Sequence, residues 1–510
     1  MTRNRLRNTK PLSALLALLL TLAPISLVAQ QTQQDPNIPT HPRELKYTTL
    51  NYTPPKREQY RQVLSNGVVA YLVEDHDLPL VNVSTIVRTG SYLDPAGKEG
   101  LAALTGSQMR TGGTTSKTAE EFDEAADFLA ANISSSIGGT QGSANVNLLS
   151  KDIDQGLALY FEMLRNPRFQ EDRIKLAKSQ ILQGMERRND RTDAIEGREW
   201  SRLMYGANHF STKETTKASV EAITREDMVA FHQRYYQPAG FIMAVSGDFN
   251  TREMIAKLEG SMKGWPVNKL AVPDVPQPTT VPVAGVYTVH KPDVNQGRVS
   301  IGHTGALRNS PDSYALEIMN DILGGGGFTS RITSRVRSDE GLAYSAGSNF
   351  GLGVYYPGVF RAVFQSKNTT TSQAIDIIME EINRVRTSKV SADELETAKN
   401  SAIEFFPRIF ATAAQVAGTF AQDEYTKRPA DYWSTYRGRI RAVTVDDVQR
   451  VAQKYLQPDK LVVLVVGNID EITKGNPDRP QHSLLKLAKD GQIRRIPLPD
   501  PLTMVYPTTP

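Results

Sequence analysis

The most constraining feature of this chain is a pattern of residues that occurs twice, 220 positions apart. Residues 223–248 and 443–468 both contain a Thr with an Asp three residues later, an amphipathic run, a Gln-Pro pair and an apolar run that ends in Gly. A Thr followed by an acid at that spacing is typical of a helix N-cap, Gln-Pro ends the helix, and the apolar run is typical of a strand. Each copy therefore predicts a capped helix followed by a strand.

Weaker similarities continue on both sides of this repeat. Residues 80–90 alternate like a strand before a predicted helix at 101–110, and residues 299–305 do the same before a helix at 314–323. A repeat of about 200 residues is too long for a solenoid unit, so it indicates gene duplication into two similar α+β lobes.

Composition divides the chain into six parts. Pro-rich and Gln-rich stretches without helical or strand periodicity separate the two lobes from each other and from the ends. The predicted parts are a signal peptide at 1–29, a linker at 30–57, an N-terminal lobe at 58–272, a Pro-rich linker at 273–284, a C-terminal lobe at 285–475 and a tail at 476–510.

The first 29 residues have the three parts of a secretory signal. A basic region is followed by the apolar run Leu12–Ala23 and by small residues up to Ala29; the basic residues are Arg3, Arg5, Arg7 and Lys10. We expect removal of this segment and a periplasmic or secreted protein. The alternative, a retained N-terminal anchor, is less consistent with so short an apolar run.

Charge and cysteine content narrow the possible partners. The formal charge of +4 lies in this N-terminal segment, so a mature chain from Gln30 is formally neutral. This removes the compositional support for a nucleic-acid partner, and no membrane span is expected in the mature chain. The chain contains no Cys, which excludes disulfides and thiol chemistry.

The histidines do not form a local metal-binding motif. No two of the seven histidines lie within five residues of each other, so no helix presents a pair of them. We therefore expect no metal in this chain; His209 is interpreted as a hydrogen-bonding loop residue and His232 as part of a helix face.

A run of four glycines follows the predicted helix at 314–323. It is not a phosphate-binding loop, because no Gly-Lys-Ser/Thr follows and it leaves a helix rather than a strand. One interpretation is a helix cap and turn; the other is a mobile, substrate-binding backbone segment that lets a peptide approach closely. The residues concerned are Gly324, Gly325, Gly326 and Gly327.

The segment after these glycines carries two candidate hydrogen-bond donors. Residues 331–338 predict a short helix that Gly341 ends, and residues 342–345 look extended. Arg337 and Tyr344 flank this turn, so their seven-residue separation can bring both to one opening. The alternative is a surface charge and a half-buried strand aromatic.

These segments, in order, resemble the inverzincin metallopeptidases: pitrilysin, insulin-degrading enzyme and mitochondrial processing peptidase. The resemblance runs from about Tyr60 to Ile472; its landmarks are residues 64–68, 90–95, 98–102, 205–209 and 325–344. It implies an α+β fold of two homologous lobes, each a mainly antiparallel sheet covered by helices, like one half of a mitochondrial-processing-peptidase clam-shell.

The zinc motif of that family is degenerate here. Active members carry H-x-x-E-H on a helix after Gly-Leu-Ala, where the two His bind zinc and the Glu activates water, and a later Glu completes the site. By this resemblance Ala103, Gly106 and Ser107 replace the motif, and Gly184 replaces the later Glu. None of the four residues can supply the lost function.

The same resemblance assigns a role to Arg337 and Tyr344. Family members use an Arg and a Tyr at this spacing to hold a substrate carbonyl and to stabilise the oxyanion, and in two-chain members one subunit supplies zinc and the other supplies this pair. The resemblance implies a zinc-less subunit of an exported heterodimeric endopeptidase that acts on peptides together with a homologous zinc-bearing partner. The alternative is a catalytically inactive scaffold or peptide-binding protein of the same fold.

Overall fold

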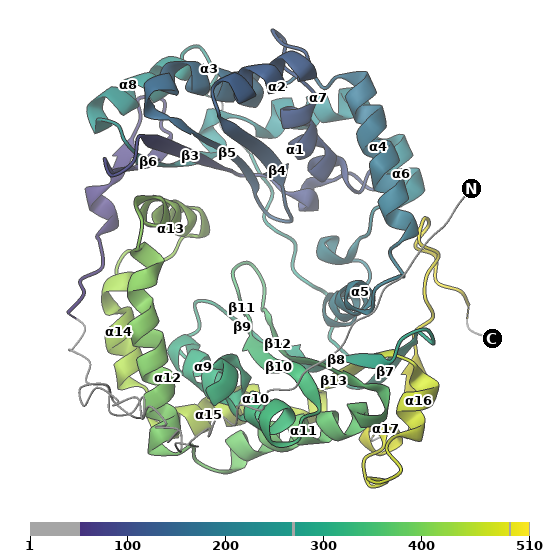
Figure 1. Cartoon of the computed structure of the whole chain (residues 1–510). Helices are drawn as coiled ribbons and strands as arrows, with labels where there is room; N and C mark the ends of the chain where they lie inside the picture. The colour runs from purple at the N-terminus through teal and green to yellow at the C-terminus, as the bar shows by residue number, and fades with distance from the viewer. Residues whose placement is uncertain (1–50, 268–270, 489–490, 509–510) are drawn as a thin grey trace, which may run out of the picture. The chain divides into compact units, whose positions relative to one another are not determined.

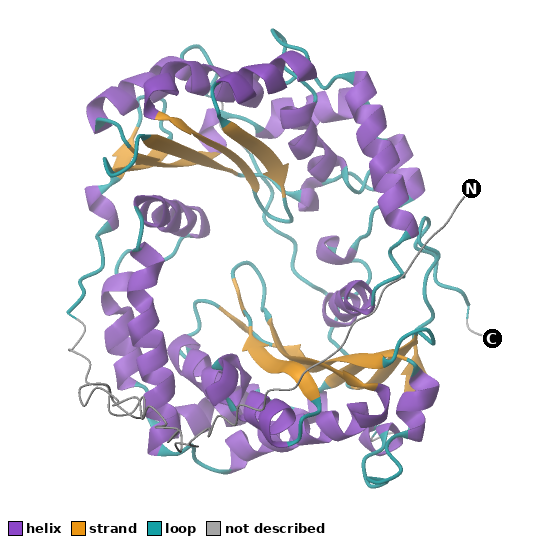
Figure 2. Ribbon diagram, in the orientation of Figure 1, coloured by secondary structure: helices purple, strands orange, loops and turns teal. Residues whose placement is uncertain are grey.

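Two six-stranded sheets organise the chain, and five strands of each are arranged in the same order (Figures 1 and 2). The computed structural model describes residues 51–267, 271–488 and 491–508, so the predicted signal peptide and most of the 30–57 linker lie outside the described residues. Residues from Tyr52 onward form one unit, which contains both lobes.

The N-terminal lobe builds its sheet in the order β1-β2-β6-β3-β5-β4. Only the β2–β6 pair is parallel. The strands are β1 Arg61–Val63, β2 Val69–Glu74, β3 Leu80–Val87, β4 Asn132–Ile137, β5 Gly142–Leu149 and β6 Phe241–Gly247. The helices are α1 Leu101–Thr111, α2 Ala119–Phe128, α3 Ile153–Arg165, α4 Glu171–Glu186, α5 Thr192–Tyr205, α6 Lys217–Ala222, α7 Arg225–Tyr235 and α8 Thr251–Ser261.

The C-terminal lobe has a sheet in the order β14-β7-β13-β8-β12-β10, in which the last five strands repeat the arrangement of β2-β6-β3-β5-β4. Its strands are β7 Gly285–His290, β8 Gln296–Thr304, β10 Ala343–Phe350, β12 Val359–Lys367, β13 Val462–Gly467 and β14 Ile493–Arg495, with a small separate pair of β9 Ala306–Leu307 and β11 Leu352–Gly353. Its helices are α9 Ser313–Asn320, α10 Arg331–Thr333, α11 Thr371–Thr387, α12 Ala392–Phe405, α13 Ala413–Thr426, α14 Tyr432–Ala442, α15 Val445–Tyr455, α16 Ile469–Lys474 and α17 Leu484–Leu487. The predicted fold class, two homologous α+β lobes with mainly antiparallel sheets, is confirmed.

The repeated sequence pattern forms the same local structure in both lobes. At the start of α7 the Thr224 hydroxyl accepts the Asp227 N–H at 3.2 Å, while the Asp227 carboxylate accepts the Thr224 N–H at 2.8 Å. Thr444 and Asp447 form the same reciprocal pair at the start of α15. Each cap satisfies backbone donors that the first helical turn leaves unpaired. The strands that follow, β6 and β13, are buried along their whole length.

Each lobe gives one helix to the other lobe's sheet. Helix α13 packs on β2 and β6, while α5 packs on β8 and β13, as Figure 1 shows. The Glu424 carboxylate of α13 accepts hydrogen bonds from Arg61 at 3.1 Å and from the Tyr71 hydroxyl at 2.8 Å. On α5 the buried Glu196 carboxylate pairs with Arg298, 3.3 Å away, and also with Arg361. The exchange covers part of the sheet face that each lobe's own helices leave open.

The segment after residue 475 has structure that the sequence pattern did not indicate. Strand β14 pairs in parallel with β7 at the edge of the C-terminal sheet. Beyond it the Pro499 carbonyl accepts a hydrogen bond from Asn189 at 2.8 Å, and the Tyr506 hydroxyl donates to Glu199 at 2.9 Å. This segment therefore joins the C-terminal sheet to the region around α5. Among the described residues, no helix combines the length and apolar character needed to cross a bilayer.

Candidate functional site

Helix α1 begins where the resemblance places the zinc-motif helix. The half-buried Asp94 carboxylate accepts the N–H groups of Gly100 at 2.9 Å and Ala102 at 2.8 Å, which satisfies two backbone donors at the start of the helix. Burial raises the pKa of Asp94 to about 6, although these two hydrogen bonds oppose the shift. Ala103, one turn into the helix, lines a cavity of about 550 Å³. Its methyl group cannot bind a metal or move a proton.

Gly106 lies against the backbone of β4. A Cβ at position 106 would lie 2.5 Å from the Ile137 nitrogen and 2.8 Å from the Ser136 carbonyl carbon. Backbone atoms cannot move aside as a flexible side chain can, so this position excludes any larger residue in the present packing. The loss at this position is therefore steric as well as chemical.

The two remaining motif positions also lack a ligand. The Ser107 hydroxyl donates to the Leu104 carbonyl of its own helix at 3.0 Å. Gly184 lies in α4 with nothing within 4 Å of where its Cβ would be. Within residues 51–267, 271–488 and 491–508, no three His, Cys, Asp or Glu side chains are grouped so that they could hold a metal ion. The residues at the motif positions do not fit zinc.

His209 and His232 make the structural contacts that the sequence analysis expected. The His209 ring bonds to the Ser211 hydroxyl at 2.7 Å and the Pro276 carbonyl at 3.1 Å. His232 is buried in α7 and its Nε2 donates to the Leu164 carbonyl at 2.8 Å. Burial lowers the pKa of His232 to about 4, so it is neutral at pH 7.

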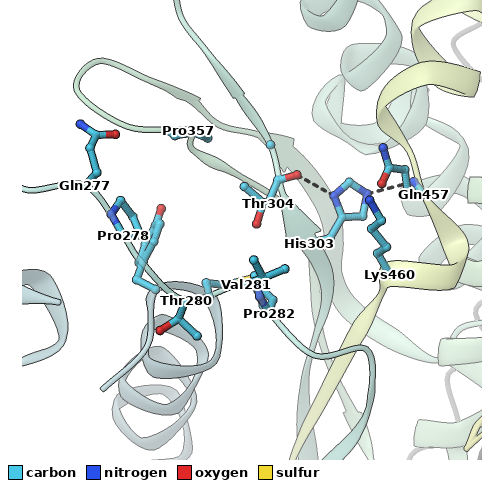
Figure 3. A pocket seen from close by; sticks show the side chains of 13 residues that line it. Gln277, Pro278, Thr280, Val281, Pro282, His303, Thr304, Pro357, Gln457 and Lys460 are labelled. Carbon is cyan, nitrogen blue, oxygen red and sulfur yellow. Dashed lines mark hydrogen bonds between the residues drawn. The ribbon is translucent and has the colours of Figure 1, made fainter. Parts of the chain in front are cut away.

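A third histidine lines a cavity of about 380 Å³ beside the Pro-rich linker (Figure 3). The Gln457 N–H donates to His303 Nε2 at 3.1 Å, so the proton is on Nδ1, which donates to the Thr304 carbonyl at 2.8 Å. Burial lowers the pKa of His303. Both ring nitrogens are engaged with backbone, which indicates a structural residue rather than a general base.

Arg337 and Tyr344 lie together, as their spacing predicted. The Arg337 guanidinium carbon lies 4.7 Å from the centre of the Tyr344 ring and 4.4 Å from the centre of the Phe328 ring. The cation therefore contacts two aromatic rings, an arrangement that holds a guanidinium without neutralising it. Tyr344 is 84% exposed, so the alternative interpretation of a half-buried strand aromatic is wrong.

A β-bulge gives Tyr344 this exposure. Strand β10 pairs Ala343 with Ser366 and Ala346 with Phe364, so the β10 side has one extra residue over this step. Tyr344 and Ser345 are consecutive and both exposed, whereas a regular strand would turn one of them into the core. Bulges of this kind redirect side chains beside functional sites. Nothing in the local sequence signalled the bulge.

The other two arginines of this segment are used to hold it in place. Arg331 is buried and makes a two-point contact with Glu394, at 2.6 and 2.9 Å. Arg335 pairs with the Glu380 and Glu381 carboxylates, each at 2.9 Å. Among the described residues, Arg337 has no carboxylate partner. The Arg337 charge is therefore available to a ligand. The ion pairs of Arg331 and Arg335 hold the helical segment that carries it.

The glycine run packs beside the same bulged strand. A Cβ at Gly324 would lie 2.5 Å from the Ser348 nitrogen of β10, and one at Gly326 would lie 2.8 Å from the Asp321 carbonyl oxygen. Gly327 has a φ of +60° and nothing within 4 Å of its missing Cβ. The run therefore lets the helical turn that follows α9, Asp321–Gly325, approach β10 closely, and its last glycine faces open space before Phe328.

Two family models cover most of the folded part of the chain. The insulinase (peptidase family M16) model matches residues 69–218, and the peptidase M16 inactive-domain model matches residues 222–402. The chain belongs to peptidase family M16. Within this M16 chain the first match contains all four degenerate zinc positions, and the second contains Arg337 and Tyr344. The residues at the positions that the resemblance aligns with the zinc motif, Ala103, Gly106, Ser107 and Gly184, have no side chain that binds zinc or activates water in this fold.

Individual M16 relatives match along nearly their whole length. The non-peptidase homolog YmxG of Helicobacter pylori is 20% identical over 398 residues, which cover 78% of this chain and 90% of that protein. The zinc protease PqqE of the same species is 24% identical over 422 residues, covering 79% and 91%. A solved M16 inactive-domain structure from Pseudomonas fluorescens has a TM-score of 0.72 at 24% identity, over 80% of this chain and 97% of that one. This last likeness confirms the two-lobe fold.

Proposed function

We propose that this chain is the zinc-less subunit of an exported, heterodimeric M16 endopeptidase. The observation that carries the proposal is that an exposed Arg337–Tyr344 pair is built into the C-terminal lobe of a chain whose zinc positions are all occupied by Ala, Gly or Ser. A homologous partner supplies the zinc site. Alone, this chain does not hydrolyse peptides.

In the assembled enzyme Tyr344 donates its phenolic hydrogen to the oxyanion of the tetrahedral intermediate. A donor aimed at developing charge in a site that excludes water contributes about 3 kcal/mol of transition-state stabilisation. The bulge at residues 344 and 345 supports this role because it turns the phenol away from the core.

Arg337 holds a carbonyl of the substrate backbone. Its guanidinium carries several donors in one plane. The contact with Phe328 and Tyr344 fixes the plane in advance, which reduces the entropy lost on binding. Gly324–Gly327 form the adjoining backbone segment, where the open side at Gly327 lets an extended peptide pass close to the chain.

Two observations support export and pairing. The first 29 residues have the arrangement of a secretory signal, which favours a periplasmic or secreted protein. One species, Helicobacter pylori, has both a relative named a non-peptidase homolog and a relative named a zinc protease. A division of labour between two M16 chains is consistent with that pair of names.

The proposal is tested by reconstitution. Mature chain from Gln30 is co-expressed with the M16 chain encoded nearest to it that carries H-x-x-E-H, and the product is analysed by size, zinc content and cleavage of quenched peptides. Each chain alone is assayed in parallel. We expect activity only in the mixture, with zinc following the partner. A stable complex without activity, or the absence of any complex, would favour the inactive scaffold or peptide-binding protein.

A further inference from the structure

We propose that the cavity beside Tyr344 binds an acidic side chain of the peptide, so that this subunit contributes specificity as well as catalysis. The inference rests on the proposed function in one respect, that the ligand is a peptide. The cavity measures about 510 Å³ and lies on the open face of the C-terminal sheet, between β8, β10 and β12. That volume is within the usual range for ligand sites and accommodates a short peptide segment.

The strand register determines which side chains face the cavity. Gln365 of β12 is paired with Arg298 of β8, and Lys367 is paired with Gln296, so these four residues form two adjacent rows on one face. Their neighbours Phe364 and Val299 are buried and point into the helix-covered core. The bulge places Tyr344 and Ser345 at the edge of the same face. The cavity is thus bounded by the proposed oxyanion donor on one side and by amides and cations on the other.

The ionisable side chains that line this cavity, apart from the Tyr344 phenol, are cationic. Lys367 is exposed and, among the described residues, has no ion-pair partner. Arg298 is 27% exposed and shares the buried Glu196 carboxylate with Arg361. One carboxylate therefore serves two guanidinium groups, and a positive charge is left over at the cavity wall.

The nearby carboxylates do not line the cavity. Glu340 accepts a hydrogen bond from Gln373 at 3.1 Å, and Glu471 accepts one from Asn368 at 2.7 Å. No Asp or Glu is among the residues that line the cavity. Arg337, whose guanidinium carbon lies 4.7 Å from the centre of the Tyr344 ring, adds a further positive charge nearby.

A peptide carboxylate entering here meets Lys367 and Arg298 as charged donors and the Gln296 and Gln365 amides as neutral ones. Charge-assisted hydrogen bonds are stronger than neutral ones, so Asp or Glu is favoured over Asn or Gln at this position. A peptide Lys would be repelled. The ion pairs that a peptide carboxylate would form with Lys367 and Arg298 are partly exposed to solvent. We therefore expect the peptide with Glu to bind about fivefold more tightly than the peptide with Gln, and this preference should weaken as added salt screens the charges.

The test measures binding and does not require turnover. Fluorescent decapeptides of Ala and Ser with one central Glu, Gln or Lys are titrated into the mature chain, and their dissociation constants are compared. Lys367→Met should abolish the preference for Glu, and Lys367→Glu should reverse it in favour of Lys. Lys263→Glu makes the same charge change at an exposed lysine of the N-terminal lobe and should leave the preference intact.

The outcomes separate this inference from the proposed function. Equal binding of the three peptides, no binding of any of them, or an unchanged preference in Lys367→Glu would overturn the acidic subsite. Turnover by the assembled enzyme is measured independently with its Tyr344→Phe variant. A preference for Glu without any turnover would support the acidic subsite and refute the peptidase role. Turnover without a preference for Glu would support the peptidase role and refute the acidic subsite.

Discussion

Gly106 and Ile137 are in direct backbone contact: a Cβ added to Gly106 of α1 would lie 2.5 Å from the Ile137 nitrogen of β4. The position that the resemblance aligns with the catalytic Glu of active members is therefore closed by a strand of the same lobe. Reintroducing the motif would require α1 and β4 to separate, so the lost activity cannot be recovered by restoring side chains alone.

This contact predicts opposite effects for two glycine substitutions at motif positions. Gly106→Ala forces a methyl group into backbone and should lower the free energy of unfolding by about 2 kcal/mol. Gly184→Ala enters open space in the last turn of α4 and should raise it by roughly 0.5 kcal/mol through helix propensity. Urea unfolding of both variants measures this difference. Equal stability of the two proteins would contradict the packing described for α1 and β4.

Tyr344→Phe removes one hydroxyl from an exposed side chain, so the fold should be unaffected. In the assembled enzyme we expect kcat to fall by about 100-fold with little change in KM, because the lost hydrogen bond forms only in the transition state. Steady-state kinetics on a quenched peptide measure both constants. Unchanged turnover would remove Tyr344 from the mechanism.

Phe328 contacts the Arg337 guanidinium and can be tested separately from the catalytic pair. Phe328→Leu keeps an apolar side chain but removes the cation–π contact at 4.4 Å, so we expect KM to rise several-fold while kcat changes less. Phe405→Leu, at another exposed phenylalanine of the same lobe, is the matched control. A fall in kcat as large as that expected for Tyr344→Phe would argue against a positioning role.

Glu196 links α5 to the C-terminal sheet through Arg298 and Arg361. Because its side chain is only 1% exposed, Glu196→Gln leaves two guanidinium groups without a counter-ion and should cost about 3 kcal/mol of stability. The corresponding change in the other lobe, Glu424→Gln, affects a carboxylate that is 23% exposed and should cost less. Chemical unfolding of the two variants measures the free energy of unfolding that each one loses. A smaller loss for Glu196→Gln than for Glu424→Gln would contradict this prediction.

Glu394 makes part of the stability depend on pH. Burial alone would raise the pKa of Glu394, but hydrogen bonds from Arg331 and Ser391 outweigh it and hold the pKa to about 2. A carboxyl whose pKa is lower in the folded state contributes stability above its unfolded pKa, near 4.5, and loses it as the pH falls towards 2. The stability difference between wild type and Glu394→Gln should therefore be full at pH 6 and shrink between pH 4.5 and 2. A difference that is constant over this range would exclude the ion pair as its source.

Features that depend on neighbouring residues could be predicted from the sequence. The caps at Thr224 and Thr444 form because the N-cap and its acid are three residues apart, and Arg337 reaches Tyr344 because a single turn separates them. The remaining features depend on contacts between distant segments. The closure of Gly106 requires β4, which begins 26 residues later, and the bulge at Tyr344 depends on the register of β10 against β12. Strand β14 spans only three residues, too few for a pattern.

The exchange of α5 and α13 between the lobes limits how far the two lobes of this chain can move relative to each other. Each lobe completes the packing of the other, so neither has a finished surface of its own and the two cannot swing apart without exposing buried carboxylates and apolar strand faces. A peptidase chamber must nevertheless open to admit a chain and release its fragments. In the proposed assembly of two such subunits, we therefore expect opening to occur between the two polypeptides, with both lobes of each subunit moving together.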